Sequence, residues 1–157
     1  MKYEIMPCTD KDGDYIDDRI CEFNLAQMPV EADSKRVVGW FGKKITDGDG
    51  KIIAGCTAVR SVWGTAELDF LWVDEAYRKQ GLGSQLLCEV ERVIKESGCT
   101  IIQLDTFDWQ ARGFYEKRGY TIFGTLEDCP PGHCQYYIKN RFDMQVSSDK
   151  TRFVGKL

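Results

Sequence analysis

The feature that most constrains the fold is an amphipathic helix predicted over residues 83–97. Its apolar side chains fall on one stripe, and Glu91 and Lys95 stand four residues apart, a spacing that favours an ion pair. Segments at residues 65–73 and 100–106 flank the helix, and their apolar residues are typical of strands. If these two strands are parallel, the helix is the crossover that their pairing requires. We therefore expect a β-α-β unit within a larger sheet.

The residues before this unit predict a helix and an antiparallel meander. The expected elements are a strand at 2–6, a helix from Tyr15 to Leu25, and strands at 37–45 and 51–62 joined by a tight turn at 47–50. After the unit, residues 108–118 predict a short helix, 120–126 and 134–142 a final strand pair, and 152–157 could form an extra strand. The order of elements predicts an α+β fold, with a mixed, mostly antiparallel sheet flanked by helices.

Composition excludes several classes of protein. The 157 residues fit one domain, and 43% hydrophobic and 29% charged residues are ordinary for a globular chain. A formal net charge of -4 without a basic stripe argues against general nucleic-acid binding. No apolar run approaches the ~18 residues of a membrane span, and residues 1–5 lack the apolar core of a signal peptide. We expect a cytoplasmic chain with no nucleic-acid or membrane partner.

The cysteines argue against both a disulfide framework and a metal centre. Their number, 7, is odd, no CxxC pair occurs, and His133 is the only histidine. Disulfide-stabilised domains and zinc sites show a different pattern. We expect free thiols in a reducing compartment and no bound metal.

The connection from the strand at 65–73 into the long helix carries the clearest binding signal. Gly81 and Gly83 stand at the first helical residues, where backbone N–H groups are unpaired and the helix dipole is positive. Glycine lets an anion approach the main chain, and Arg78 and Lys79 add positive charge. The segment predicts a phosphate-binding loop. The alternative is that both glycines only shape a tight connection.

Two common phosphate-binding patterns do not fit this loop. A P-loop needs Gly-x4-Gly-Lys-Ser/Thr, which is absent, and a dinucleotide-binding fingerprint needs a third glycine where Leu86 stands. A nucleotide-binding module is therefore the weaker interpretation.

Two motifs resemble those of the GNAT superfamily of acetyltransferases. The run Arg78-Lys-Gln-Gly81-Leu-Gly83, after a strand that ends at 71–74, is similar to the signature Gln/Arg-x-x-Gly-x-Gly/Ala. Residues 111–120, Ala-x-x-Phe-Tyr-Glu-Lys-x-Gly-Tyr, resemble the second hallmark of the family. The order of elements also agrees. The resemblance implies a GNAT-like acyl-CoA N-acyltransferase domain over residues 1–142, followed by a tail at 143–157. Its sheet would be splayed between the strands at 65–73 and 100–106.

By this resemblance the cosubstrate is acetyl-CoA. The turn would hold its pyrophosphate, and the strand before the turn would pair with its pantetheine arm. The residues implied in cofactor binding are Leu71, Trp72, Val73, Arg78, Lys79, Gln80, Gly81, Leu82, Gly83, Ser84 and Asp108. Asp108 stands where many members carry Asn, so it would either contact the cofactor or cap the helix at 108–118.

Acetyl transfer to an amine requires loss of a proton from the amine, stabilisation of an oxyanion and protonation of the departing thiolate. The resemblance implies Tyr115 as the acid and Glu67 as the base. Asp69 is the second candidate for the base, because strand alternation puts Glu67, Asp69, Leu71 and Val73 on one face. Val73 would offer backbone to the acetyl carbonyl. Each side chain could instead be structural, Tyr115 as a core aromatic and the acids as solvated strand residues.

His133 lies between the last two strands, in a loop that often lines the acceptor pocket in this family, although a surface histidine is the plainer interpretation.

The resemblance implies an N-acetyltransferase that moves acetyl from acetyl-CoA to a primary amine by direct transfer in a ternary complex. A small-molecule acceptor is preferred. Alternatives are an acyl-CoA-binding sensor without turnover and a protein N-terminal or lysine acetyltransferase. The tail could serve a homodimer.

Overall fold

A computed structural model describes residues 5–30 and 39–142 of the chain, which divides into two compact units, Met1–Ser34 and Lys35–Leu157. The first unit contains α1 (Asp10–Gln27), so the predicted helix is confirmed and begins earlier than expected. Thr9 caps it: the Thr9 side chain accepts from the Asp12 N–H, and the Asp12 carboxylate accepts from the Thr9 N–H at 2.8 Å. Of the predicted strand at 2–6, Ile5 and Met6 are not in a strand, and the rest lies outside the described residues.

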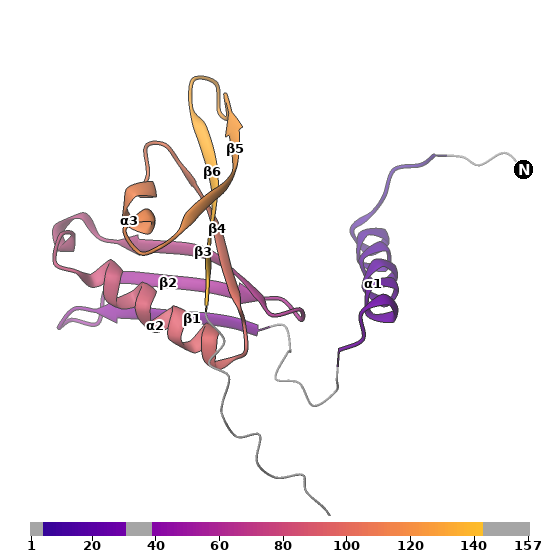
Figure 1. The fold of residues 1–157 in the computed structure, drawn as a ribbon, viewed down its shortest axis with the longest axis horizontal. Helices are drawn as coiled ribbons and strands as arrows, with labels where there is room; N and C mark the ends of the chain where they lie inside the picture. The colour runs from indigo at the N-terminus through magenta and orange to yellow at the C-terminus, as the bar shows by residue number, and fades with distance from the viewer. Residues whose placement is uncertain (1–4, 31–38, 143–157) are drawn as a thin grey trace, which may run out of the picture. The chain divides into compact units, whose positions relative to one another are not determined.

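The second unit is built on a mixed six-stranded sheet in the order β1-β2-β3-β4-β6-β5 (Figure 1). Its elements are β1 (Gly39–Thr46), β2 (Ile52–Arg60), β3 (Thr65–Val73), the 3-10 turn η1 (Glu75–Tyr77), α2 (Leu82–Glu96), β4 (Ile101–Phe107), α3 (Arg112–Glu116), β5 (Thr121–Glu127) and β6 (Cys134–Arg141). Among the strands of the described residues, only β3 and β4 pair in parallel, with α2 as the crossover between them. The predicted β-α-β unit and the mostly antiparallel mixed sheet are therefore confirmed.

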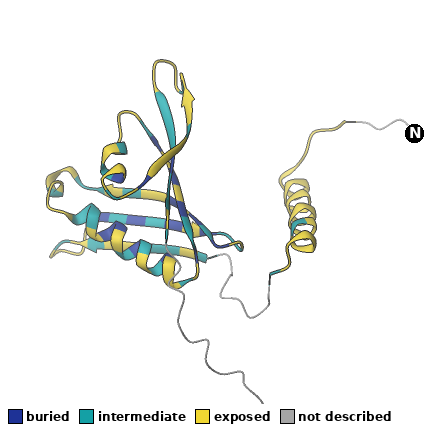
Figure 2. Ribbon diagram, viewed as in Figure 1, coloured by how far each residue is buried: buried dark blue, intermediate teal, exposed yellow. Residues whose placement is uncertain are grey.

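Helix α2 covers one face of β1, β2 and β3, and the core lies beneath it (Figures 1 and 2). Leu87, Val90 and Ile94 on its inner stripe are fully buried. Burying a side chain of this size contributes roughly 1.5–3 kcal/mol each. The helix ends at Glu96 with Ser97 as its C-cap, and Gly98 follows in the left-handed conformation with φ 89°. The predicted amphipathic stripe therefore holds α2 on the sheet.

The strands β3 and β4 pair only at their first residues. The parallel ladder joins Thr65, Ala66 and Glu67 to residues 101–103, and beyond Glu67 the strands diverge. β4 instead continues along β6, from Ile101 opposite Arg141 to Phe107 opposite Gln135. The sheet is thus splayed at the expected place, and from Leu68 onward the edge of β3 that faces β4 is unpaired in this ladder.

A β-bulge interrupts β3 at Asp69. On the neighbouring strand β2, Ala58 pairs with Leu68 and Thr57 pairs with Phe70, so Asp69 is an extra residue on β3. The extra residue shifts the alternation of side chains between the two faces of β3 by one position.

This phase change contradicts the predicted alternation of β3. Leu71 and Val73 pack against the core on the α2 side, where a Cβ at Gly83 would lie 3.5 Å from Val73 Cγ2. Glu67 is exposed and lies between the buried residues that precede the bulge. The prediction that Glu67, Asp69, Leu71 and Val73 share one face is therefore wrong, because the extra residue moves the last two to the other face.

Two local predictions are also corrected. The helix predicted at 108–118 is only α3 (Arg112–Glu116), because the residues before it form a turn in which the Gln110 side chain accepts from the Phe107 N–H at 2.9 Å. The ion pair expected between Glu91 and Lys95 does not form: Glu91 accepts a hydrogen bond from Tyr120 instead. The strand suggested at 152–157 lies outside the described residues.

Within the described parts of the chain, no helix is both long and apolar enough to cross a membrane. The same residues contain no group of three or more His, Cys, Asp or Glu side chains arranged to hold a metal ion.

Candidate active site

The divergence of β3 and β4 opens a cleft of about 970 Å³ in the second unit. Its walls are the two separated strands, and its open end is formed by the loop that leads into α2 and by the region of α3. The lining residues are Leu68, Asp69, Phe70, Leu71, Trp72, Val73, Tyr77, Arg78, Lys79, Gly81, Leu82, Gly83, Ser84, Leu104, Asp105, Thr106, Phe107, Trp109, Gln110, Ala111, Phe114 and Tyr115.

The loop before α2 is shaped to bind an anion. Lys79 and Gly81 both adopt left-handed backbone conformations, with φ of 62° and 83°, and Gly81 is the N-cap of α2 without a side-chain cap. The first N–H groups of a helix have no intrahelical acceptor, and they point out of its positive end. Arg78 and Lys79 add two cations, and the Arg78 Nε is held by the Val73 carbonyl at 3.1 Å.

A Cβ at Gly81 would meet only the Gln85 amide nitrogen, at 4.0 Å, so the space above this glycine is open. A phosphate can therefore approach the main chain here. The loop fits a phosphorylated ligand such as the pyrophosphate of a coenzyme.

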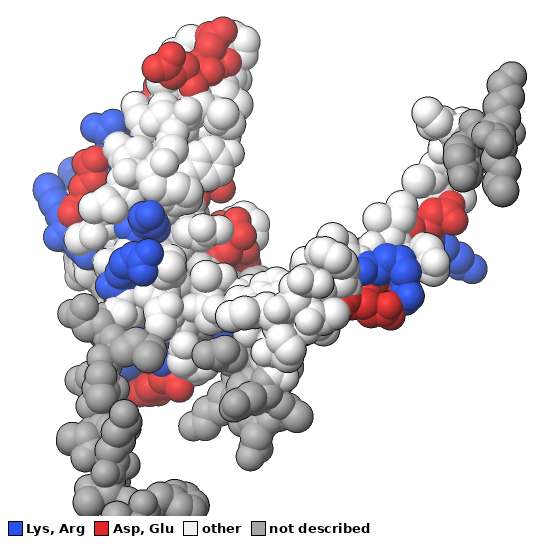
Figure 3. All heavy atoms as spheres, turned by 45° about the vertical axis from the view of Figure 1, so that its right-hand side comes forward, with Lys and Arg blue, Asp and Glu red and all other residues white. Residues whose placement is uncertain are grey.

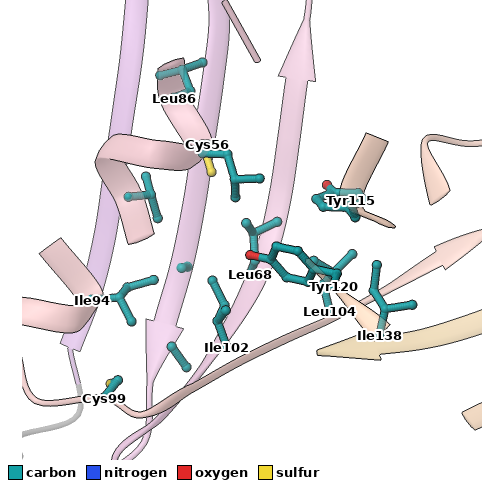
Figure 4. Close-up of a cluster of buried hydrophobic side chains, with 14 of the residues drawn as sticks. Cys56, Leu68, Leu86, Ile94, Cys99, Ile102, Leu104, Tyr115, Tyr120 and Ile138 are labelled. Atoms are coloured by element: carbon teal, nitrogen blue, oxygen red, sulfur yellow. The ribbon is translucent and has the colours of Figure 1, made fainter. Parts of the chain in front are cut away.

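Tyr115 forms part of the cleft wall from the α3 side. Tyr115 is only 6% exposed, and Figure 4 shows its ring beside that of Tyr120. The centroid of the Tyr115 ring lies 5.5 Å from that of Tyr120 and 5.1 Å from that of Phe114. Burial raises the pKa of the Tyr115 phenol to about 12, an effect that Cys56 reinforces and Arg118 opposes. At neutral pH Tyr115 is a protonated group that can donate to a ligand in the cleft.

Behind Tyr115 lies a buried polar contact between α2 and the start of β5. The Tyr120 hydroxyl donates to Glu91 Oε1 at 2.7 Å, and burial raises the pKa of the Glu91 carboxyl. Burial also raises the pKa of the Cys56 thiol to about 12, with Glu91 adding to the shift. Cys56 is therefore a neutral thiol at physiological pH, and no cysteine is among the residues that line the cleft.

Three carboxylates lie along the divergent strands. Glu67 is the last residue of β3 that pairs with β4, where these two strands begin to separate, and it does not itself line the cleft. Asp69, in the bulge, and Asp105, on β4, both line it. Gln135 on β6 donates to Asp105 Oδ2 at 2.6 Å and fixes the orientation of that carboxylate.

Asp108 neither lines the cleft nor caps α3, whose N-cap is Ala111. It joins the end of β4 to the loop before β6: Asp108 Oδ1 lies 3.0 Å from His133 Nδ1, and Oδ2 accepts from the Cys134 N–H at 3.3 Å. The prediction that Asp108 caps a helix over 108–118 is wrong, because the backbone around it continues along β6. His133 contacts the edge of Trp109, with ring centroids 4.6 Å apart, and Trp109 does line the cleft.

The structure brings together most of the residues expected at the cofactor. Every predicted cofactor residue except Gln80 and Asp108 lines the cleft, and so does Tyr115. Sequence reasoning missed Asp105 and Trp109. Asp105 was detectable as an acid inside the strand predicted at 100–106, whereas the place of Trp109 depends on its stacking against Phe107, with ring centroids 4.4 Å apart.

Comparisons with known proteins agree with this geometry. The profile described as the acetyltransferase (GNAT) family matches residues 6–120. The crystal structure of an acetyltransferase from Bacillus cereus ATCC 14579 is 36% identical with a TM-score of 0.81, and the match covers 89% of this chain and 98% of that one. The chain therefore belongs to the GNAT family of acetyltransferases, whose cosubstrate is acetyl-CoA. The predicted family and fold are confirmed.

Two further relatives show how far the likeness extends. The blasticidin-S acetyltransferase of Streptomyces morookaense is 41% identical over 81 residues, which are 51% of this chain and 60% of that protein. A Bacillus subtilis (strain 168) relative matches over 44% of its own length, so the chain spans less than two thirds of both. An aminoglycoside 6'-N-acetyltransferase complexed with coenzyme A has a TM-score of 0.59 at 16% identity over 88% of this chain and 97% of that one, and shares the fold.

Proposed function

We propose that the chain transfers an acetyl group from acetyl-CoA to the primary amine of a small molecule, directly and within a ternary complex. The observation that carries this proposal is the cleft between β3 and β4. It has an anion-binding loop at its open end and a protonated phenol in its wall.

The shape of the cleft supports this placement of acetyl-CoA. The loop at 78–84 and the first N–H groups of α2 would hold the phosphates, with Arg78 and Lys79 opposite their charge. The unpaired edge of β3 after Glu67 offers backbone groups to the amides of the pantetheine arm. An arm that follows this edge extends from the loop toward the point where β3 and β4 meet. A backbone N–H of β3 could then stabilise the oxyanion.

In this proposal Tyr115 is the general acid. The amine nitrogen attacks the acetyl carbonyl carbon, and the carbon–sulfur bond then breaks. Tyr115 gives its proton to the departing thiolate sulfur. Its raised pKa, which burial causes, keeps the phenol protonated before the transfer.

Glu67 is the proposed base, with Asp69 as the alternative. Glu67 lies where the strands separate, on the face opposite α2, while Asp69 lines the cleft within the bulge. Either carboxylate could take the proton from the amine, directly or through water. The absence of cysteine from the cleft lining favours direct transfer over an acetyl-cysteine intermediate.

The amine acceptor and turnover are tested together by measuring CoA release. Purified protein and acetyl-CoA are incubated with primary amines, diamines, blasticidin S and a peptide with a free N-terminus. We expect release with small amines and intersecting double-reciprocal lines, which indicate a ternary complex. Acetyl-CoA binding without release for any acceptor would identify a sensor instead, and release with the peptide alone would identify a protein acetyltransferase.

The base is tested by the pH dependence of the rate. Glu67→Gln should lower kcat/KM for the amine by ~10²-fold or more at low pH, where neutral amine is scarce, and leave acetyl-CoA affinity unchanged. Asp69→Asn is the matched variant, since it removes the same charge two residues away. A profile of Glu67→Gln that superimposes on that of the wild type, together with a loss in Asp69→Asn, would transfer the role to Asp69.

A further inference from the structure

Asp105 occupies a position in the cleft to which acetyl transfer itself assigns no role. Its side chain is exposed on β4, and the Gln135 side chain donates to one of its two oxygens, Oδ2. Within residues 39–142, the structure gives Oδ1 no hydrogen-bond donor. A carboxylate whose orientation is fixed and whose second oxygen is available is suited to accept from a cationic ligand.

The alternation of β4 sets the side from which a ligand reaches this oxygen. Ile102 and Leu104 belong to the core beneath α2, and Thr106 is also buried. Gln103 and Asp105 therefore lie on the opposite face of the sheet. Tyr115 approaches the cleft from the core side, so a ligand bound at Asp105 would come from the face away from the phenol.

The charges of the cleft fall into two separate groups. The cations Arg78 and Lys79 are in the loop before α2, whereas the carboxylates Asp69 and Asp105 lie on the strands. Further acidic side chains lie at the tip of the β5–β6 hairpin, where β5 ends at Glu127 (Figure 3). The loop suits the phosphates of coenzyme A, and the strands suit a ligand of positive charge.

An aromatic wall follows Asp105 in the chain, formed by Phe107 at the end of β4 and Trp109 in the turn after it. Phe107 and Trp109 stack with ring centroids 4.4 Å apart and an angle of 4° between their planes, and both line the cleft. Trp109 is 54% exposed, so part of its surface is available to a ligand. Aromatic faces attract organic cations, and they cover the apolar carbons between two charged groups.

We propose that Asp105 determines acceptor specificity by binding a second cationic group, so that the preferred acceptor is a diamine or a guanidino-amine. This inference rests on the proposed function. The attacking nitrogen must be neutral when it reaches the acetyl carbonyl, so the charge that Asp105 holds belongs to another group of the same molecule. Gln135 acts as a positioning residue that keeps the carboxylate turned toward this group.

The test compares matched acceptors in the CoA-release assay. Each of a series of α,ω-diamines with three to six carbons, and agmatine, is paired with the monoamine of the same chain length. For the best diamine, we expect the wild-type kcat/KM to exceed that of its monoamine by roughly tenfold or more, as expected for a hydrogen bond to a charged group. Asp105→Asn should remove this preference and leave the KM for acetyl-CoA and the monoamine rate unchanged.

Two further variants complete the design. Glu127→Gln removes one negative charge outside the cleft and should keep the preference. Gln135→Leu frees the Asp105 carboxylate and should lower the preference without abolishing turnover. If the wild type shows no preference for any diamine, or if Asp105→Asn slows monoamines and diamines equally, this inference is wrong while the proposed function stands. No release by the wild type with any acceptor overturns both.

Discussion

At the scale of the residue, Tyr115 concentrates the chemistry proposed for this chain. Its phenol is buried, lines the cleft and stays protonated because burial raises its pKa to about 12. Tyr115→Phe removes only the hydroxyl. We expect kcat to fall by ~10²–10⁴-fold with acetyl-CoA affinity retained, since the lost interaction acts on the departing thiolate. Single-turnover CoA release and calorimetry on one preparation measure both quantities.

Tyr120→Phe is the matched control for this prediction. Tyr120 lies next to Tyr115 but does not line the cleft, and its hydroxyl donates to Glu91. Its loss should cost about 1–3 kcal/mol of stability with turnover per folded molecule retained. Full activity of Tyr115→Phe with a lowered Tm would show that Tyr115 is a core aromatic without a catalytic role.

The raised pKa of Tyr115 also has a consequence for stability. Folding favours the protonated phenol, so its contribution is fully present below the ordinary pKa of 10.0 and is lost as the pH rises toward about 12. The free energy of unfolding, measured with urea, should therefore fall less for Tyr115→Phe than for the wild type between these two pH values. Burial also raises the pKa of the Cys56 thiol to about 12 in the wild type. Because Cys56 is present in both proteins, the difference between their stability curves reports Tyr115 together with its coupling to Cys56.

At the scale of the element, the helices, strands and turns that were predicted correctly are those that residues close together in the chain determine. The stripe of α2, the Asp47–Gly50 turn and the strands on either side of α2 are encoded by side chains close together in the chain. Residues 78–83 were predicted as an anion-binding loop for the same reason. Each of these features depends on spacing and turn chemistry that neighbouring residues supply.

Features that arise from pairing between distant residues were not predictable. The bulge at Asp69 exists because Thr57 and Ala58 of β2 pair on either side of it, and no residue of β3 signals the extra position. The short α3 has a similar cause, since Asp108 is engaged by Cys134 and His133. The bulge matters for the site, because it leaves Glu67 and the cleft-lining residues Leu71 and Val73, which we propose contact the cofactor, on opposite faces of the sheet.

At the scale of the whole molecule, the central claim is that the cleft binds acetyl-CoA through the loop before α2. Gly81 tests it because the chain offers a matched control. Gly81 and Gly50 have almost the same conformation, with φ of 83° and 82°, and a Cβ on either would project into open space. Only Gly81 lines the cleft, whereas Gly50 lies in the hairpin between β1 and β2. Valine at either position carries a similar backbone strain of about 1–2 kcal/mol.

The decisive measurement is titration calorimetry of acetyl-CoA into the wild type, Gly81→Val and Gly50→Val, with the fold of each checked by circular dichroism. Valine at position 81 would keep the phosphates away from the N–H groups of the loop. We expect Gly50→Val to bind acetyl-CoA as the wild type does. Gly81→Val should lose affinity by roughly tenfold to a hundredfold, which corresponds to the loss of one or more hydrogen bonds to a charged group. Wild-type affinity in a folded Gly81→Val protein would contradict the assignment of this loop to the cosubstrate.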